Sequence, residues 1–340
     1  MLSIFRESVH RGAKIQKWWQ TFNVNYINRV VFCTTFVKPQ QKVFGMNRLR
    51  PHLALILCNI IWAMDYPFYT IVLGRYVEPL PMVTAALVVT ALLSLVPLIW
   101  EPAERVEPRD KRLFFGAALL VGVVRKLMMM YGLSQTSPID GSIINTVGPL
   151  LVLLISVALG FDRFTKRKIA GLLLGMGGAV AVVLTGAAAK HENSDMVGNL
   201  LILGAACTTA CYMVWFKRLV TRYKTTTVMR WIYCIAALVV LPFGTESLIH
   251  TDFAALHGRT LFAALFVIFV PTYLPNLMLN YALRNVAPTV TSIYGYLQPL
   301  LAIAISVAMG LDRLHWDTVA FAAVIFCGVW LVVSSYKVNG

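Results

Sequence analysis

The chain has 340 residues, of which 58% are hydrophobic and only 13% are charged. A soluble domain carries about 25% charged residues, so this composition excludes a water-soluble fold and is typical of an integral membrane protein. Lys and Arg number 30 against 15 Asp and Glu, a formal net charge of +15. The basic residues fall in the predicted loops and form no single patch, so nucleic acid is not an expected partner. The six cysteines lie mostly in apolar runs without a Cys-x-x-Cys motif, and neither a metal site nor a disulfide framework is predicted.

The first part of the chain is basic. It carries nine Lys or Arg against one acidic residue, Glu7, and no apolar stretch long enough for a signal peptide. Residues 1–50 are therefore predicted as a basic cytoplasmic N-terminal segment. An alternative is that translation begins at Met46, since residues 46–50 form a short basic lead into the first span. The sequence leaves both possibilities open.

Ten apolar stretches follow one another after this segment. A transmembrane helix needs about 20 predominantly apolar residues, and polar or turn-forming residues separate the stretches. The short connections leave no room for a further soluble domain. We expect an all-α integral membrane protein with ten transmembrane helices. The predicted spans are 52–73, 80–100, 112–133, 138–159, 168–187, 197–216, 228–243, 260–281, 288–309 and 317–336.

The positive-inside rule predicts the orientation, because cytoplasmic loops carry an excess of Lys and Arg. With the N-terminus inside, fourteen basic residues fall on the cytoplasmic side and four on the opposite side, before the N-terminal segment is counted. Both termini are thus expected in the cytoplasm, and the protein is expected as a multi-pass component of the plasma (inner) membrane. The four opposite residues are Arg75, Lys190, Arg259 and Arg313.

The chain repeats itself at a shift of 150 residues. About 15 of 33 positions are identical, without a gap, between 131–163 and 281–313. The match includes Pro-Leu-Leu, Ile-Ser-Val-Ala and Gly-x-Asp-Arg segments, more than two apolar helices share by composition. Each repeat holds five spans, an odd number, so the second copy enters the membrane from the opposite side. We expect two inverted five-helix repeats at 51–187 and 197–336, a plan that places a binding site between the halves and favours a transporter.

These features resemble the drug/metabolite transporter (DMT) superfamily, specifically its EamA-type ten-helix transporters. The resemblance covers about residues 46–336 and is carried by the five-plus-five plan, by a first span centred on Trp62, and by the repeated motif that ends each fourth span. It implies a permease in which helices one to four of each half surround a central cavity, with the fifth and tenth set apart. The family motif usually has Glu where this chain has Asp162 and Asp312. The sequence departs from the family in two further places: many members carry Arg early in the second span, whereas 83–90 contains none, and Asp65 stands where small polar residues are common.

Three ionisable residues lie deep inside the predicted spans: Asp65, Arg125 and Lys126. Such residues are energetically costly in a membrane and by default mark a functional site. Asp65 and Arg125 each lie about thirteen residues into spans that run in the same direction. At about 1.5 Å per residue, both are therefore roughly 20 Å from the inner end and close enough in depth to pair.

Two interpretations of these charges remain open. In the first, Asp65 and a base form a buried ion pair that locks span one to span three. In the second, the basic pair holds a carboxylate or phosphate while Asp65 takes an amino group or a proton, since Arg suits bidentate anion recognition. The second interpretation predicts a small anionic or zwitterionic metabolite, such as an amino acid, and leaves a coupling proton or ion open.

Further polar and aromatic side chains in the spans can orient a ligand in a mostly apolar pocket, although each can equally be a packing residue. Pro271 and Pro275 are expected to kink the eighth span and expose backbone carbonyls, and Pro149 and Pro299 are expected kinks or hinges. The glycines of span five, Gly171, Gly175 and Gly178, predict close helix packing. The further candidate substrate-binding residues are Trp62, Tyr66, Asn145, Tyr212, Trp215, Tyr273, Asn276, Asn280, Tyr294 and Gln298.

The resulting hypothesis is a secondary active transporter, with export favoured, and not an enzyme. The alternative is a polytopic membrane enzyme or sensor without transport activity. No His-Glu-x-x-His, Gly-x-Ser-x-Gly or Walker A motif is present, and no cofactor is predicted. The expected partners are a small-molecule metabolite and the lipid bilayer, and the sequence gives no indication of the oligomeric state.

Overall fold

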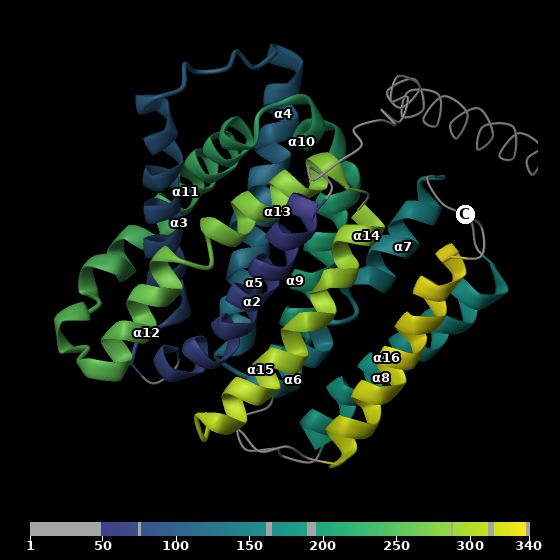
Figure 1. The fold of residues 1–340 in the computed structure, drawn as a ribbon. Coiled ribbons are helices and arrows are strands. Elements are labelled where there is room, and N and C mark those ends of the chain that lie inside the picture. The colour runs from purple at the N-terminus through teal and green to yellow at the C-terminus, as the bar shows by residue number, and fades with distance from the viewer. Residues whose placement is uncertain are drawn as a thin grey trace, which may run out of the picture. The chain divides into compact units, whose positions relative to one another are not determined.

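The computed structural model describes residues 49–73, 76–160, 165–188, 195–286, 288–311 and 316–337. These residues form helices joined by short connections and include no β-strand, only an isolated bridge between Leu73 and Val77 (Figure 1). The all-α prediction is confirmed. Residues 1–48, Asp162 and Asp312 lie outside the described residues.

The first half makes five helical passes in the described chain. Prolines begin three of its helices, where a missing N–H is harmless and the fixed φ suits the first turn. The helices are α2 (Leu49–Val72), α3 (Pro79–Leu95) with the 3₁₀ turn η2 (Val96–Ile99), α4 (Pro108–Ala117) with the π-helix η3 (Ala118–Val124) and α5 (Arg125–Leu133), α6 (Pro138–Asn145) with α7 (Gly148–Ala158), and α8 (Lys166–Ala188).

The second half repeats this plan. Its described helices are α9 (Met196–Trp215), the short α10 (Lys217–Arg222), α11 (Thr225–His250), the 3₁₀ turn η4 (Phe253–Ala255), α12 (Gly258–Phe269) with α13 (Leu274–Asn285), α14 (Pro288–Ile293) with η5 (Tyr294–Tyr296) and α15 (Leu297–Ala308), and α16 (Trp316–Lys337). Eight passes are long and apolar enough to cross a membrane, and α16 contains a shorter apolar stretch, Val319–Gly328. Together the described helices make ten passes.

Several passes are interrupted. The eighth pass breaks between Phe269 and Leu274, where Pro271 follows α12 and Pro275 lies in the first turn of α13. The fourth pass breaks after Asn145, and Pro149 lies in the first turn of α7. A break frees backbone carbonyls that an uninterrupted helix would use internally, so these passes can offer polar groups at membrane depth.

The helix contacts follow a two-fold pattern. Helix α2 packs against α13 and α15 of the second half, and its counterpart α9 packs against α5 and α7 of the first half. Helix α3 packs against α11, and α8 lies beside α16 (Figure 1). The fourth pass of each half ends at a glycine with positive φ, 75° at Gly160 and 66° at Gly310. The two glycines are 150 residues apart, so the repeated sequence has a repeated backbone.

Helices α8 and α16 pack through glycine, which allows their backbones to approach closely. A β-carbon at Gly328 of α16 would lie 2.5 Å from both the Gly171 carbonyl oxygen and the Gly175 nitrogen of α8. At Gly178 a β-carbon would lie 2.8 Å from a side-chain carbon of Ile325. The prediction of a small-residue packing face in span five is confirmed.

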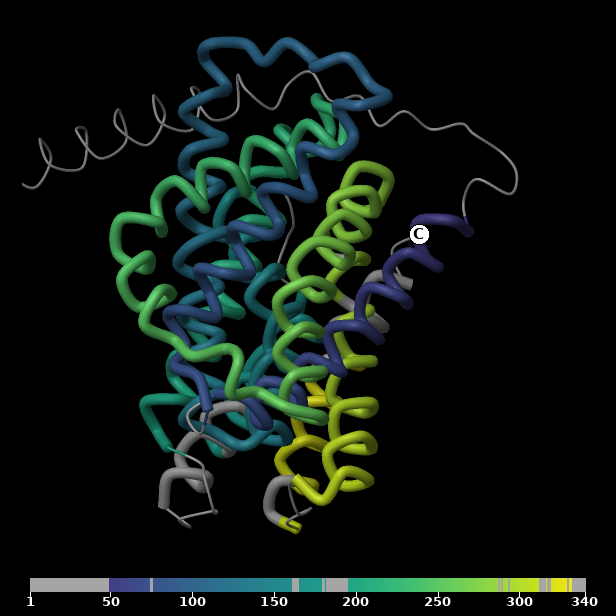
Figure 2. The backbone as a smooth tube through the Cα atoms, turned by 90° about the vertical axis from the view of Figure 1, so that its left-hand side faces the viewer, coloured from purple at the N-terminus to yellow at the C-terminus, as the bar shows by residue number. Residues whose placement is uncertain are grey.

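One end of the bundle holds the α3–α4 connection, which lies against the turn between α10 and α11 (Figure 2). Helix α11 is longer than the predicted span 228–243, because it begins at Thr225 and continues to His250 through Pro242. The apolar run ends near Phe243, but the helical hydrogen bonds do not require apolar side chains.

Candidate functional site

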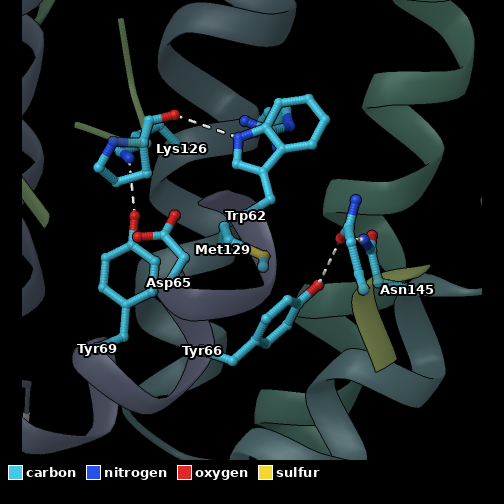
Figure 3. Close-up of a pocket in the computed structure, with 10 residues that line it drawn as sticks. Trp62, Asp65, Tyr66, Tyr69, Lys126, Met129 and Asn145 are labelled. Carbon is cyan, nitrogen blue, oxygen red and sulfur yellow. Dashed lines mark hydrogen bonds between the residues drawn. The ribbon is translucent and has the colours of Figure 1, made fainter. Parts of the chain in front are cut away.

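A polar cavity lies where the interrupted passes meet α2 (Figure 3). The space between its lining atoms, open solvent included, is about 340 Å³. Its lining comes from α2, α5, α6, α15 and the break between α12 and α13, so both halves of the molecule contribute. The lining residues are Trp62, Asp65, Tyr66, Tyr69, Arg125, Lys126, Met129, Asn145, Pro271 and Gln298.

Helix α2 supplies the largest share of this lining. Trp62, Asp65, Tyr66 and Tyr69 recur at helical spacing and therefore share one face of the helix. The indole Nε1 of Trp62 donates a hydrogen bond to the Pro271 carbonyl oxygen at 3.2 Å. The interruption of the eighth pass thus provides an acceptor for α2, which fixes the indole beside the cavity.

Lys126 joins three elements at the cavity wall. Its side chain is only 4% exposed. Its Nζ donates to the Tyr69 hydroxyl at 2.8 Å, which links α5 to α2 (Figure 3). It also donates to the Thr272 hydroxyl at 2.7 Å, which links α5 to the α12–α13 break. The ammonium also lies 5.5 Å from the centre of the Tyr69 ring. These bonds occupy two of its three donors, so Lys126 holds the helices together as well as carrying charge.

Arg125 is held differently. Its Nε donates to the Thr209 hydroxyl at 2.9 Å, and its guanidinium carbon lies 5.4 Å from the centre of the Trp62 ring. Within the described residues, neither terminal nitrogen of Arg125 donates a hydrogen bond to protein. The guanidinium is therefore oriented through Nε and the indole, while its terminal donors remain available to a ligand.

Asp65 is buried in the same cavity with 6% of its surface exposed. Its Oδ1 is shielded from solvent and has no hydrogen-bond partner. No ion pair within 4.0 Å joins it to Arg125 or Lys126 in the described chain, although both cations act on its carboxylate electrostatically. Lys126 bonds to two hydroxyls instead of to the carboxylate, so the link between α2 and α5 does not run through a direct Asp65 ion pair. A buried carboxylate oxygen without a donor is costly, and it marks a place for a ligand proton.

The opposite wall is a chain of neutral amides. The Oε1 of Gln298 accepts hydrogen bonds from the Asn145 amide at 3.0 Å and from the Tyr66 hydroxyl at 3.4 Å (Figure 3). Its Nε2 donates to Asn59 Oδ1 at 2.6 Å, and the Asn59 amide in turn donates to the Leu55 carbonyl oxygen at 2.6 Å. The cavity therefore has a charged wall on α2 and α5 and an uncharged polar wall on α6 and α15.

The structure brings many of the predicted residues to this cavity and leaves others elsewhere. Tyr212 donates to Asn280 Oδ1 at 2.5 Å in a buried contact between α9 and α13, and the Asn276 amide donates to the Thr272 carbonyl oxygen at 2.8 Å. Tyr294 bonds to His52 at 2.6 Å. The predicted residues outside the cavity lining are Tyr212, Trp215, Tyr273, Asn276, Asn280, Tyr294, Pro149, Pro275 and Pro299.

Sequence reasoning missed Tyr69 and Met129, which line the cavity, and Thr272, which binds the Lys126 ammonium. Tyr69 follows Asp65 by four residues, so its helical spacing was an available signal. Thr272 carried no such signal, because its position depends on the break in the eighth pass.

A second polar cluster closes the end of the bundle where the α3–α4 connection meets α10 and α11. Arg222 Nη1 lies 2.9 Å from the Asp110 carboxylate, and Arg222 also pairs with Glu107. Tyr223 donates to the Asp110 carboxylate at 2.7 Å. Lys217 Nζ donates to the Leu283 carbonyl oxygen at 2.6 Å, and burial lowers the pKa of Lys217 to about 8. Loops of the first half are thereby tied to helix ends of the second half.

Known proteins share this sequence pattern and fold. A family model described as the EamA-like transporter family matches residues 49–184 and 196–334. An uncharacterized transporter of Archaeoglobus fulgidus is 22% identical over 289 residues, which cover 84% of this chain and 98% of that protein. A probable amino-acid metabolite efflux pump of Salmonella typhimurium is 23% identical over 306 residues, covering 86% of this chain and 98% of the pump.

A solved crystal structure superposes on this chain with a TM-score of 0.59 at 17% identity, covering 83% of this chain and 96% of that chain. At this identity the superposition shows the fold alone. The resemblance to EamA-type transporters predicted from the sequence is confirmed by the family match and by the relatives.

Proposed function

Because the chain belongs to the EamA-like transporter family, we propose that it is a secondary active transporter that exports a small zwitterionic or anionic metabolite of the amino-acid class. Its general role as a multi-pass membrane transporter follows from the family and from the spanning helices. The substrate class, the direction and the mechanism are the proposal. The name of the Salmonella typhimurium relative, a probable amino-acid metabolite efflux pump, agrees with it.

One observation carries the substrate class: Arg125 and Asp65 face one cavity, and each keeps unused hydrogen-bonding capacity. The terminal nitrogens of Arg125 form a planar fork that matches a carboxylate. The unpartnered Oδ1 of Asp65 accepts from an ammonium group. A zwitterion satisfies both groups together, which makes an amino acid a better match than a simple cation.

In this proposal the remaining wall of the cavity contacts the side chain of the substrate. Gln298 and Asn145 offer amide groups, whereas Trp62 and Met129 offer apolar surface. A mostly enclosed cavity with a few convergent polar groups favours a small ligand. In this proposal Lys126 contributes positive charge and keeps α2, α5 and the α12–α13 break in register.

Transport proceeds in this proposal by alternating access between two inverted repeats at 51–187 and 197–336, with the cavity between them. A proton and the substrate ammonium compete for the same oxygen of Asp65, which offers a way to couple export to proton entry. The excess of basic residues in one set of loops supports an orientation with both termini in the cytoplasm. The plasma membrane is the proposed location.

The test is transport by the purified protein in proteoliposomes, with radiolabelled neutral amino acids and organic acids. Arg125→Gln and Asp65→Asn should each lower the rate of amino-acid transport at least tenfold, because each removes one of the two charged anchors. Arg259→Gln and Glu78→Gln change exposed charges outside the cavity and serve as matched controls. Unchanged transport in both Arg125→Gln and Asp65→Asn would refute the proposed site.

A further inference from the structure

A second hollow lies between α3 and α11, at the end of the bundle that holds the α3–α4 connection. The space between its lining atoms, open solvent included, is about 230 Å³, and it shares no lining residue with the central cavity. Helix α3 belongs to the first half and α11 to the second. The residues that matter for the argument are Ser94, Leu98, Glu101, Thr226, Thr227 and Arg230.

The N-terminus of α11 opens toward this hollow, and its first-turn N–H groups are not capped by the side chain of the N-cap residue. Lys224 occupies the N-cap position and makes no side-chain hydrogen bond to the first turn. The first helical bond runs from the Val228 N–H to the Lys224 carbonyl oxygen, at 3.0 Å. The three N–H groups before it have no partner within the helix, and the helix dipole adds partial positive charge there, which favours an anion.

Two side chains of the same helix support a ligand at this place. Thr227 lines the hollow and is only 3% exposed, yet its hydroxyl makes no hydrogen bond within the described chain. Arg230 lines the hollow one turn further along and is half-buried. It too makes no hydrogen bond or ion pair in the described part of the protein. A buried hydroxyl and a half-buried guanidinium are both expected to have hydrogen-bond partners. A ligand in the hollow that accepts from both groups would supply them.

Arg230 is the positive charge of the hollow without an acidic partner among the described residues. Glu101 is the acidic residue of the hollow, and this carboxylate lies 3.5 Å from the Lys224 ammonium. The nearby Glu104 carboxylate accepts from the Lys224 N–H at 2.9 Å. No ion pair within 4.0 Å joins Glu101 to Arg230 in the described chain. Phosphate oxygens accept several hydrogen bonds at once and match guanidinium, hydroxyl and backbone donors together.

The surroundings point to a lipid as the source of that phosphate. Leu98 lines the hollow, and the next two residues project from the surface, Ile99 with 81% and Trp100 with 69% of its area exposed. Exposed apolar groups with a Trp at the end of a spanning helix are typical of the level of the lipid headgroups. At this end the segment from α10 to the start of α11 is basic, with Lys217, Arg218, Arg222 and Lys224, whereas the α3–α4 connection carries three Glu against one Arg. Basic pockets between transmembrane helices on the cytoplasmic side bind anionic headgroups.

We propose that the hollow between α3 and α11 binds the phosphate of an anionic phospholipid, with Arg230, the Thr227 hydroxyl and the first N–H groups of α11 as donors. The lipid's acyl chains lie along the exposed apolar surface at Ile99 and Trp100. Because α3 and α11 come from different halves, the bound lipid stabilises the conformation in which these helices are packed together. The assignment of this end to the cytoplasmic leaflet rests on the orientation in the proposed function, whereas the site itself does not depend on transport.

The experiment measures lipid binding to the full-length purified protein in detergent. Native mass spectrometry and thermal unfolding are the two readouts. The probes are phosphatidylglycerol, phosphatidylcholine and inorganic phosphate. Native mass spectra of the unmodified protein should show a defined number of bound phosphatidylglycerol molecules. Phosphatidylglycerol should also raise the unfolding temperature of the unmodified protein more than phosphatidylcholine does. Arg230→Gln should weaken this binding about tenfold and Thr227→Val about threefold, since each removes donors to the phosphate.

Arg112→Gln is the matched control, because Arg112 is an exposed arginine of α4 that lines neither cavity. Its affinity for phosphatidylglycerol should stay within twofold of the unmodified protein. Circular dichroism at 222 nm checks that each variant is folded, and Thr227→Val keeps the shape of the side chain. Equal affinity in Arg230→Gln and Arg112→Gln would overturn the site. If inorganic phosphate alone raised the unfolding temperature as much as phosphatidylglycerol does, the lipid would be ruled out as the source of the bound phosphate.

Discussion

Replacing Lys126 with methionine tests how the charges of the central cavity stabilise the fold. The change keeps the length of the side chain and removes the ammonium, together with its hydrogen bonds to the hydroxyls of Tyr69 and Thr272. A hydrogen bond from a charged group contributes at least about 1.5 kcal/mol, so the two bonds together contribute about 3 kcal/mol. Removal of the ammonium also ends the cost of burying it, which offsets part of that loss.

The carboxylate of Asp65 adds a second contribution, because it loses a neighbouring positive charge. The two charged groups are more than 4.0 Å apart, and at an effective dielectric constant of about 20 their attraction is at most about 4 kcal/mol. We expect Lys126→Met to lower the free energy of unfolding by about 2–4 kcal/mol. Asp65→Asn alone should change it less, because no basic side chain in the described chain lies within 4.0 Å of the Asp65 carboxylate and its Oδ1 has no hydrogen bond to lose.

The decisive quantity is the coupling between the two substitutions. If Lys126 stabilises the buried carboxylate through space, the double variant should lose about 1–3 kcal/mol less than the sum of the single variants. Equilibrium unfolding in mixed micelles, followed by tryptophan fluorescence, measures all four proteins. Lys126→Met combined with Glu78→Gln is the control pair. A coupling below about 0.5 kcal/mol would mean that Lys126 acts only through its hydroxyl partners, and the electrostatic reasoning would be wrong.

Three further predictions concern other parts of the molecule. A β-carbon at Gly244 of α11 would lie 1.9 Å from the Thr84 hydroxyl of α3, so Gly244→Ala should lower the free energy of unfolding by about 1–3 kcal/mol, and Thr84→Ala added to it should restore part of the loss. Because burial lowers the pKa of Lys217 to about 8 from 10.5, the folded protein binds fewer protons than the unfolded chain between these values. Stability should therefore rise as the pH increases from 8 to 10.5, and pH titration of unfolding should show a smaller rise in Lys217→Met. Arg222→Gln leaves the buried carboxylate of Asp110 without its cation, so thermal unfolding should report a loss of about 1–3 kcal/mol, and a loss below about 0.3 kcal/mol would contradict the contact.

The helical passes could be predicted from sequence because the membrane imposes a length and an apolar composition on each. The hydrophobic pattern does not show where an α-helix becomes a π-helix, because the side chains on both sides of that point are equally apolar. The π-helix η3 lies within an apolar run, directly before Arg125. The extra residue of a π-helical turn shifts the direction of every side chain after it, and π-helical turns are frequent at functional sites. An apolar run cannot reveal that shift.

The charged part of the site was accessible because charge inside a span is rare and visible in the sequence. Its partners were less accessible. The hydroxyl of Thr272 reaches Lys126 only because the eighth pass breaks there. Arg230 was counted within a predicted span and drew no attention, whereas in the structure it lies in the second turn of α11, near the end of the bundle. The depth of a residue in the membrane depends on where its helix begins. Amino-acid composition alone gives only an approximate position for that first residue.

Within the described residues, the two halves contribute differently to the charged cavity. Trp62 and Tyr212 occupy equivalent positions of the two halves, but Trp62 donates to a backbone carbonyl freed by the α12–α13 break, whereas Tyr212 donates to a side chain, that of Asn280 in α13. The break lies at Pro271 and Pro275, and the latter is the counterpart of Arg125 at the 150-residue shift. The second half thus has a proline where the first half has a cation, and the break at this proline supplies an acceptor to α2. A scaffold with two-fold contacts can therefore hold a single asymmetric ligand, because the first half provides the charges and the second half provides the Thr209 and Thr272 hydroxyls that orient Arg125 and Lys126.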